Sequence, residues 1–166
     1  MSDDTRPIDT RALRRACGSF ATGVTVITTR TEEGDHGMTA NAFMSVSMNP
    51  PLLTISLDKK TRMLGHIRRS GRYAVNVLSG EMEHLAMHFA GKAQPGRGAV
   101  LLDERDGLPV LPRASAVFLT DVEQEFEVGD HVLFVGRVSE FEQNEDASPL
   151  LFCGGQFVQF PEMAST

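Results

Sequence analysis

Residues able to bind a polar ligand are concentrated between positions 38 and 51. The segment begins Met38-Thr39-Ala40-Asn41-Ala42 and continues through further serines to a Pro-Pro pair. Small side chains leave backbone amides unhindered, and threonine and asparagine add hydrogen-bonding side chains. Such a loop can bond a flat polar ligand at close range. Taken alone, the same residues also fit an ordinary polar entry into the apolar strand that follows.

A second block able to do binding chemistry is Asp58-Lys59-Lys60-Thr61-Arg62. It follows a predicted strand and opens a predicted helix, so cations, a hydroxyl and free backbone N–H groups meet at one helix N-terminus. That end of a helix attracts phosphate. The two blocks together predict a mononucleotide-like cofactor, with its ring at the first block and its phosphate at the second. The competing interpretation of the second block is a solvated charged surface.

Composition limits the classes of protein that fit. The 166 residues are 41% hydrophobic, enough for one domain with its own core, which we place at 11–162 after a flexible segment at 1–10. The net charge of -6 argues against a nucleic-acid partner. No apolar run approaches the roughly 20 residues that span a membrane. Only Cys17 and Cys153 occur, without a CxxC pair, so we expect a reducing cytoplasm and no disulfide framework.

Hydrophobic patterning predicts many strands and few helices. Strands are expected at 23–29, 51–57 and 72–78, in a long antiparallel hairpin at 116–127 and 131–138, and in a short pair at 150–158. Helices are expected from position 8 to near Gly18, at 61–69 and at 81–89, with a long loop at 91–112. Because closing a sheet removes its exposed edges, this pattern favours a small barrel.

One pattern typical of metal sites is weak. Glu81, His84 and His88 fall on one face of the predicted helix, with the histidines four residues apart. The HExxH order is absent and no third strong ligand is visible, so a solvated helix face is the better interpretation and we predict no metal. The two cysteines are most simply small apolar residues.

Several strings of residues, taken in their order and spacing along the chain, match the pattern of a known family. They are Phe20-Ala21-Thr22-Gly23-Val24-Thr25-Val26, Thr39-Ala40-Asn41-Ala42-Phe43 with Ser45-Val46-Ser47 and Pro50-Pro51-Leu52, Ser70-Gly71-Arg72-Tyr73-Ala74-Val75-Asn76-Val77-Leu78, Phe89-Ala90-Gly91 and Gly129-Asp130-His131. On these residues the chain, from about Arg11 to Phe160, resembles the flavin reductase-like family. The resemblance implies a mainly β fold, an FMN-binding split β-barrel with Greek-key-like connections and a few short flanking helices.

The resemblance also implies an activity. Family members are NAD(P)H:flavin oxidoreductases that transfer hydride from NADH or NADPH to FMN or FAD. They are homodimers with the flavin site beside the subunit interface, and they supply reduced flavin to a partner monooxygenase. The chemistry of hydride transfer belongs to the two cofactors, so the protein is required chiefly to bind and orient them.

Individual site residues follow from the same resemblance. The isoalloxazine ring is assigned to Thr39, Ala40, Asn41 and Ala42. The ribityl chain and phosphate are assigned to Ser56, Leu57, Asp58, Lys59, Thr61 and Arg62. The segment Phe89, Ala90 and Gly91 is placed near the phosphate or an adenylate extension. His131 is the candidate catalytic residue at the nicotinamide or flavin edge, with Gly155 and Phe157 on the nicotinamide side; a polar residue at a hairpin end is the plainer interpretation of His131.

Departures from the family pattern keep two alternatives open. Met82 stands where members often carry glutamine, and Phe152 and Phe157 stand where tyrosine is frequent, so hydrogen-bonding groups are lost from the nicotinamide side. One alternative is a protein that keeps its flavin tightly bound and reduces another acceptor. The other is a flavin- or haem-binding carrier without reductase activity.

Overall fold

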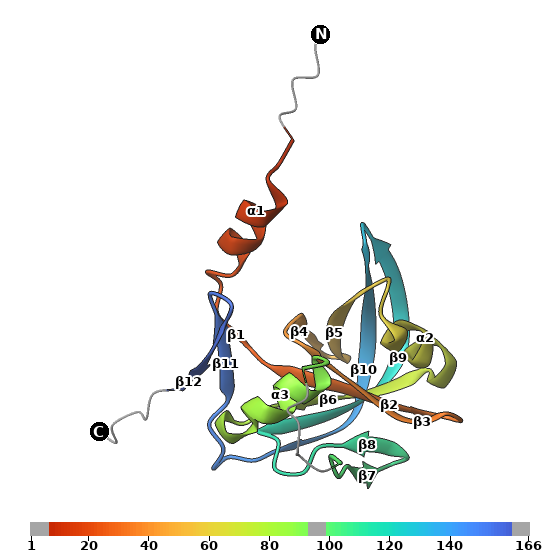
Figure 1. Cartoon of the computed structure of the whole chain (residues 1–166). Coiled ribbons are helices and arrows are strands. Elements are labelled where there is room, and N and C mark those ends of the chain that lie inside the picture. Colours follow the sequence, from red (N-terminus) through yellow and green to blue (C-terminus); the bar gives the residue numbers. More distant parts are fainter. Residues whose placement is uncertain (1–6, 93–98, 161–166) are drawn as a thin grey trace.

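The computed structural model of the chain describes residues 7–92 and 99–160 (Figure 1). Its helices are few and short: α1 at Thr10–Cys17, α2 at Arg62–Ser70, α3 at Glu83–Phe89 and the 3-10 turn η1 at Gly80–Met82. The predicted mainly β class is confirmed. Of the predicted flexible segment at 1–10, residues 1–6 lie outside the described residues, and Thr10 already begins α1. Residues 161 and 162 of the predicted domain also lie outside the described residues.

The described strands form one large antiparallel sheet and two small ones. The large sheet has the order β3-β2-β6-β9-β10-β5-β4, a second sheet the order β1-β11-β12, and β7 pairs with β8. The strands are β1 Thr22–Gly23, β2 Thr25–Thr31, β3 Gly34–Ala40, β4 Phe43–Met48, β5 Pro51–Asp58, β6 Arg72–Val77, β7 Asp103–Arg105, β8 Leu108–Val110, β9 Ala116–Val128, β10 His131–Gln143, β11 Leu150–Cys153 and β12 Gln156–Gln159.

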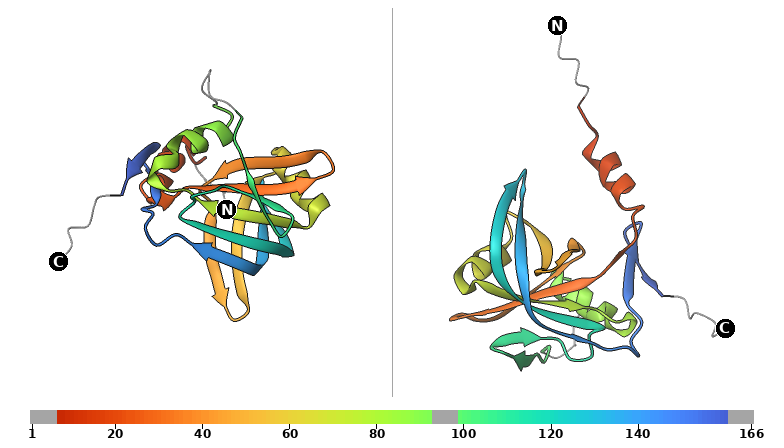
Figure 2. Two further views of the ribbon diagram at one scale, coloured as in Figure 1. Left: turned by 90° about the horizontal axis from the view of Figure 1, so that it is seen from below. Right: turned by 180° about the vertical axis from the view of Figure 1, so that it is seen from behind.

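The large sheet curves around the main core, as its views from below and behind show (Figure 2). Ile27, Ile55, Val75 and Phe134 come from four of its strands, and each is fully buried together with Ile67 of α2. Burying a side chain of this size contributes about 1.5–3 kcal/mol. Because β3 and β4 are the two edge strands, hydrogen bonds among the described residues leave the curved sheet open between them.

Three predicted boundaries are wrong. The predicted strand at 23–29 is divided between β1 and β2, which belong to different sheets. The polar segment at 38–51 is mostly strand, so only Asn41 and Ala42 connect β3 to β4. The predicted loop at 91–112, of which 93–98 lie outside the described residues, contains the β7–β8 hairpin. Leu108 and Val110 bury this hairpin against the large sheet, a long-range contact that local sequence does not reveal.

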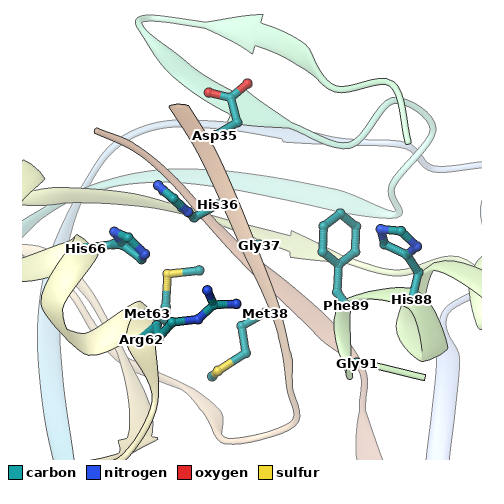
Figure 3. A pocket seen from close by; sticks show the side chains of 10 residues that line it. All are labelled: Asp35, His36, Gly37, Met38, Arg62, Met63, His66, His88, Phe89 and Gly91. Carbon is teal, nitrogen blue, oxygen red and sulfur yellow. The ribbon is translucent and has the colours of Figure 1, made fainter. Parts of the chain in front are cut away.

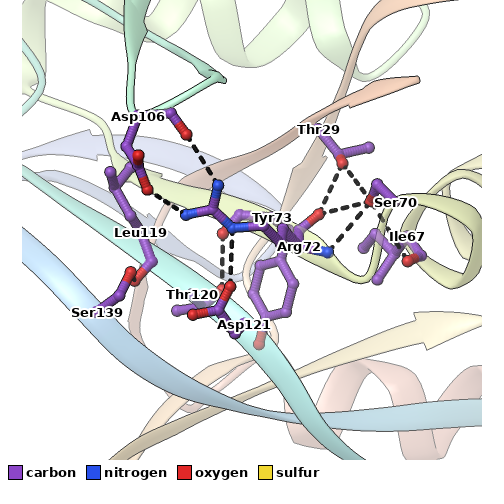
Figure 4. A network of polar contacts seen from close by, with 10 residues as sticks. All are labelled: Thr29, Ile67, Ser70, Arg72, Tyr73, Asp106, Leu119, Thr120, Asp121 and Ser139. Atoms are coloured by element: carbon purple, nitrogen blue, oxygen red, sulfur yellow. Dashed lines mark hydrogen bonds and ion pairs between the residues drawn. The ribbon is translucent and has the colours of Figure 1, made fainter. Parts of the chain in front are cut away.

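A polar network fixes β6 between its neighbours and the end of α2 (Figure 4). The Arg72 guanidinium donates to the carboxylates of Asp121, on β9, and Asp106, before β8. On the other side, the Thr29 hydroxyl of β2 donates to the Arg72 carbonyl at 2.7 Å. Gly71, in the left-handed conformation with φ of 69°, ends α2 immediately before β6. Helix α2 is therefore held at its C-terminus to the centre of the sheet.

The N-terminal helix and the β1-β11-β12 sheet extend away from the large sheet (Figure 1). None of the α1 residues is buried, and Leu13 and Phe20 are 51% and 79% exposed. Gly154 and Gly155 both have positive φ, as the tight turn between β11 and β12 requires. Among the described helices, none has the length and apolar character needed to cross a membrane.

Candidate functional site

The β3–β4 connection presents backbone donors. Its carbonyl oxygens are occupied, because Asn41 O accepts from the Phe43 amide at 2.9 Å and Ala42 O accepts from the Ser56 amide at 3.1 Å. Within the described part of the chain, the amides of Asn41 and Ala42 donate no hydrogen bond, and the Asn41 side chain makes none. Two amide groups and one side-chain amide are therefore available to a ligand at this position.

Strand β3 and helix α3 are fixed closely together beside this connection. The Thr39 hydroxyl donates to the Ala86 carbonyl of α3 at 2.7 Å. The Phe89 ring lies so close to Gly37 that a Cβ added to the glycine would fall 2.4 Å from it. The Thr39 hydroxyl thus uses its proton to position α3.

A cavity of about 460 Å³, here called the α3–β12 cavity, lies at the β3–β4 connection. It brings residues 39–41 together with Gly155 and Phe157, although more than a hundred residues separate them in sequence. The Phe152 and Phe157 rings meet edge to face, with centroids 5.4 Å apart, and form an apolar wall. The lining residues are Val24, Thr39, Ala40, Asn41, Glu83, Met87, Ala90, Lys92, Phe152, Gly155, Gln156 and Phe157.

A second cavity of about 420 Å³, the α2–α3 cavity, is lined by residues of β3, α2 and the end of α3 (Figure 3). Arg62 enters it from the start of α2, and Phe89 and Gly91 come from the end of α3. All three were assigned to a phosphate or its adenylate extension. The lining residues are Asp35, His36, Gly37, Met38, Arg62, Met63, His66, His88, Phe89 and Gly91.

The α2–α3 cavity contains three histidines, of which the sequence singled out only His88, in the metal pattern that was set aside. His36 and His66 stack, with ring centroids 3.5 Å apart and planes 12° from parallel, and His88 lines the α3 side. Burial, and then the neighbouring charges of His36 and Arg69, lower the pKa of His66 below its ordinary value. These residues come from separate elements, so no spacing in the sequence could have grouped them.

The predicted phosphate block is largely occupied by internal contacts. The Thr61 hydroxyl donates to the Asp58 carbonyl at 2.9 Å, and the Asp58 carboxylate accepts from the Lys60 amide at 2.8 Å. Leu57 is 1% exposed and belongs to the core. Arg62 is the member of the block that lines a cavity, whereas Ala42, Ser56, Leu57, Asp58, Lys59 and Thr61 line neither of the two.

His131 begins β10, directly opposite Asp58 of β5. Its Nδ1 atom lies 2.7 Å from an Asp130 carboxylate oxygen, and this contact lowers the pKa of the Asp130 carboxyl. His131 lines neither cavity, so its catalytic assignment stays a prediction. Met82, one of the departures from the family pattern, is buried in the core, where its sulfur accepts from the Ser79 amide.

The chain is similar to known proteins in both sequence and structure. The flavin reductase like domain matches residues 17–161. An NADH-dependent flavin reductase of a Rhodococcus species is 42% identical, over 87% of this chain and 83% of that protein. The flavin reductase PheA2 superimposes with a TM-score of 0.89 at 46% identity, covering 93% of this chain and all of that one. The styrene monooxygenase flavin reductase of Pseudomonas putida S12 gives 0.83 at 35% identity, covering 92% and 99%.

Proposed function

This chain belongs to the flavin reductase like domain family, and on that basis we propose that it is an NADH-dependent flavin reductase acting on FMN or FAD. The α3–β12 cavity carries the proposal. It joins residues 39–41, assigned to the flavin ring, to Gly155 and Phe157, assigned to the nicotinamide. Its volume lies within the range of small-molecule sites. The two cofactors supply hydride transfer themselves when their rings are held face to face.

The residues present fit a flavin ring. The amides of Asn41 and Ala42 are fixed donors without partners in the described part of the chain, and the Asn41 side chain adds a donor and an acceptor. Donors placed in advance stabilise negative charge that develops during a reaction. The apolar wall of Phe152 and Phe157 gives a flat ring a surface to stack on and excludes water.

We assign the flavin phosphate to the α2–α3 cavity. This cavity and the α3–β12 cavity lie on successive residues of β3, Met38 and Thr39, and on successive residues at the end of α3, Phe89 and Ala90. Arg62 supplies a charge-assisted bond to a phosphate there. A mononucleotide lying across β3 would then place its ring and its phosphate in adjoining cavities. We also propose NADPH as an alternative hydride donor. In the same proposal, His131 acts at the nicotinamide edge.

We further propose a homodimer that passes reduced flavin to a partner monooxygenase. Helix α1 buries none of its residues, and Ile8, Leu13 and Phe20 are all more than half exposed. Leu13 is on this projecting helix and Ile8 and Phe20 flank it, and apolar side chains so exposed favour a protein contact. A relative named as a styrene monooxygenase flavin reductase supports this class of partner. Analytical ultracentrifugation of the full chain tests the dimer: a sedimentation coefficient of an 18.1 kDa monomer at micromolar concentration would contradict it.

The activity is tested on the purified protein. Its visible spectrum is recorded, and NADH and NADPH oxidation is followed at 340 nm with and without added FMN, FAD or riboflavin. Turnover of NADH that depends on added flavin is expected. A protein that retains flavin through gel filtration and oxidises NADH only with another acceptor would favour the tightly bound alternative. A protein that binds flavin and leaves both nicotinamides unoxidised would favour the carrier.

A further inference from the structure

A group of potential metal ligands lies at the edge of the α2–α3 cavity. Glu33 is in the turn between β2 and β3, His36 is on β3, and His66 is on α2. One ligand atom from each residue lies within 4.8 Å of the other two. Figure 3 shows the two histidine side chains close together, His36 from β3 and His66 from α2. The Glu81, His84 and His88 set considered from the sequence does not form such a group among the described residues.

The three potential ligands differ in burial and therefore in how freely their side chains can move. His66 is 7% exposed and held by packing, and the half-buried His36 ring stacks on it with planes 12° from parallel. Nitrogen lone pairs lie in the ring plane, so the His36 side chain must rotate before both rings can bind one ion. Glu33 is exposed and lies in a turn, so its carboxylate can adjust its position. Two imidazoles with one carboxylate form a common ligand set in zinc sites with an open coordination position.

The Arg69 guanidinium already places positive charge at this point. It lies 2.8 Å from a Glu33 carboxylate oxygen and 2.7 Å from His66 Nδ1, so it contacts two of the three potential ligands. The side chains of Arg69 and Glu33 are 55% and 59% exposed. An ion pair this exposed contributes at most about 1 kcal/mol, so a cation that binds more strongly can displace the guanidinium.

We propose that Glu33, His36 and His66 bind a divalent cation of the zinc class. Imidazole and carboxylate ligands suit Zn²⁺ and its neighbours in the first transition series. Metal-to-ligand distances of about 2.0–2.2 Å place the ligand atoms about 3.4 Å apart around a tetrahedral ion. Side-chain rotation of Glu33 and His36 provides the contraction from the present separations. The fourth position of the ion is open to the α2–α3 cavity.

This proposal does not depend on the proposed reductase activity. Flavin reduction by a nicotinamide requires no metal ion, and the three residues are outside the α3–β12 cavity. His36 and His66 line the α2–α3 cavity, to which the flavin phosphate is assigned, so variants of these residues are judged by zinc binding without flavin and not by activity. An inactive protein could still bind the ion.

Zinc titration tests the site directly. Metal-free protein without added flavin is titrated with ZnCl2 by isothermal calorimetry, and its thermal midpoint is followed in parallel. One ion per chain is expected. His36→Gln and Glu33→Gln are each expected to weaken the zinc affinity by at least about tenfold. Loss of a residue that only orients a metal ligand already costs about this much. His84→Gln is the matched control, because His84 is exposed and outside the group.

The Arg69→Met variant separates this site from adventitious binding to surface histidines. It keeps most of the side-chain length and removes the competing cation, so tighter zinc binding is expected. Circular dichroism of each variant verifies that it is folded. Absence of stoichiometric binding by the unmodified chain, or equal affinity in the His36→Gln and His84→Gln variants, would overturn the proposal.

Discussion

Lys59 Nζ lies 2.9 Å from Glu127 Oε2, joining the end of β5 to the β9–β10 hairpin. The contact lowers the pKa of the Glu127 carboxyl, because the ammonium group stabilises the carboxylate. Lys59 is thus paired with a carboxylate of the same chain, whereas Arg62 lines the α2–α3 cavity. Two cations that looked equivalent in sequence occupy different environments.

Arg62→Gln is therefore expected to impair phosphate recognition more than Lys59→Gln. Loss of a charge-assisted bond of about 1.5–3 kcal/mol raises the Kd for FMN by about tenfold or more. Flavin fluorescence quenching measures this Kd. Riboflavin, which lacks the phosphate, provides the control: its Kd should change little in either variant. A larger effect from Lys59→Gln than from Arg62→Gln would place the phosphate at the β9–β10 hairpin instead.

Asn76→Ala is expected to destabilise the fold. Asn76 is fully buried, its Nδ2 donates to the Val26 carbonyl at 2.9 Å, and its Oδ1 accepts from the Leu111 amide at 2.7 Å. The variant leaves these buried groups unpaired at about 1–3 kcal/mol each, so the free energy of unfolding should fall by at least about 2 kcal/mol. Urea unfolding measures the change. Asn144→Ala, which removes an exposed bond, should lower it by less than about 1 kcal/mol.

Local patterns and distant contacts explain what the sequence could predict. The hairpin at 116–138 alternates apolar and polar residues, and Gly129 supplies its positive-φ turn, so its strands were predictable. The β7–β8 hairpin was not, because Asn76 and Thr28, 35 and 81 residues earlier, hold Leu111 and Pro109 in place. The same limit applies to the site: residues 39–41 were found as a string, whereas the histidines of the α2–α3 cavity come from three elements.

Two glycine substitutions are expected to have opposite effects. Gly65 lies within α2, and a Cβ there would meet no atom within 4 Å, so Gly65→Ala should stabilise the protein by about 0.5–1 kcal/mol. At Gly136 a Cβ would fall 2.4 Å from the Tyr73 hydroxyl, so Gly136→Ala should destabilise by about 1–3 kcal/mol through overpacking. Thermal unfolding followed by circular dichroism compares the two. A lower midpoint for Gly65→Ala would contradict the open space seen beside α2.

Tyr73 is expected to make stability fall at alkaline pH. The side chain is fully buried, and burial raises the pKa of its hydroxyl to about 12, against about 10 in an unfolded chain. Between these values the unfolded chain releases the proton while the folded chain keeps it. The free energy of unfolding therefore falls as pH rises through this window, by up to about 1.4 kcal/mol per pH unit from this group.

Tyr73→Phe isolates that contribution. Among the described residues the Tyr73 hydroxyl has no hydrogen-bond partner, so its removal should leave the free energy of unfolding at pH 8 unchanged or higher. Urea unfolding of both proteins at several values between pH 8 and about pH 11 gives the comparison. The advantage of the phenylalanine variant should widen above about pH 10. Parallel pH profiles would mean that the hydroxyl ionises with the same pKa in the folded and unfolded chains, contrary to its burial beneath Gly136.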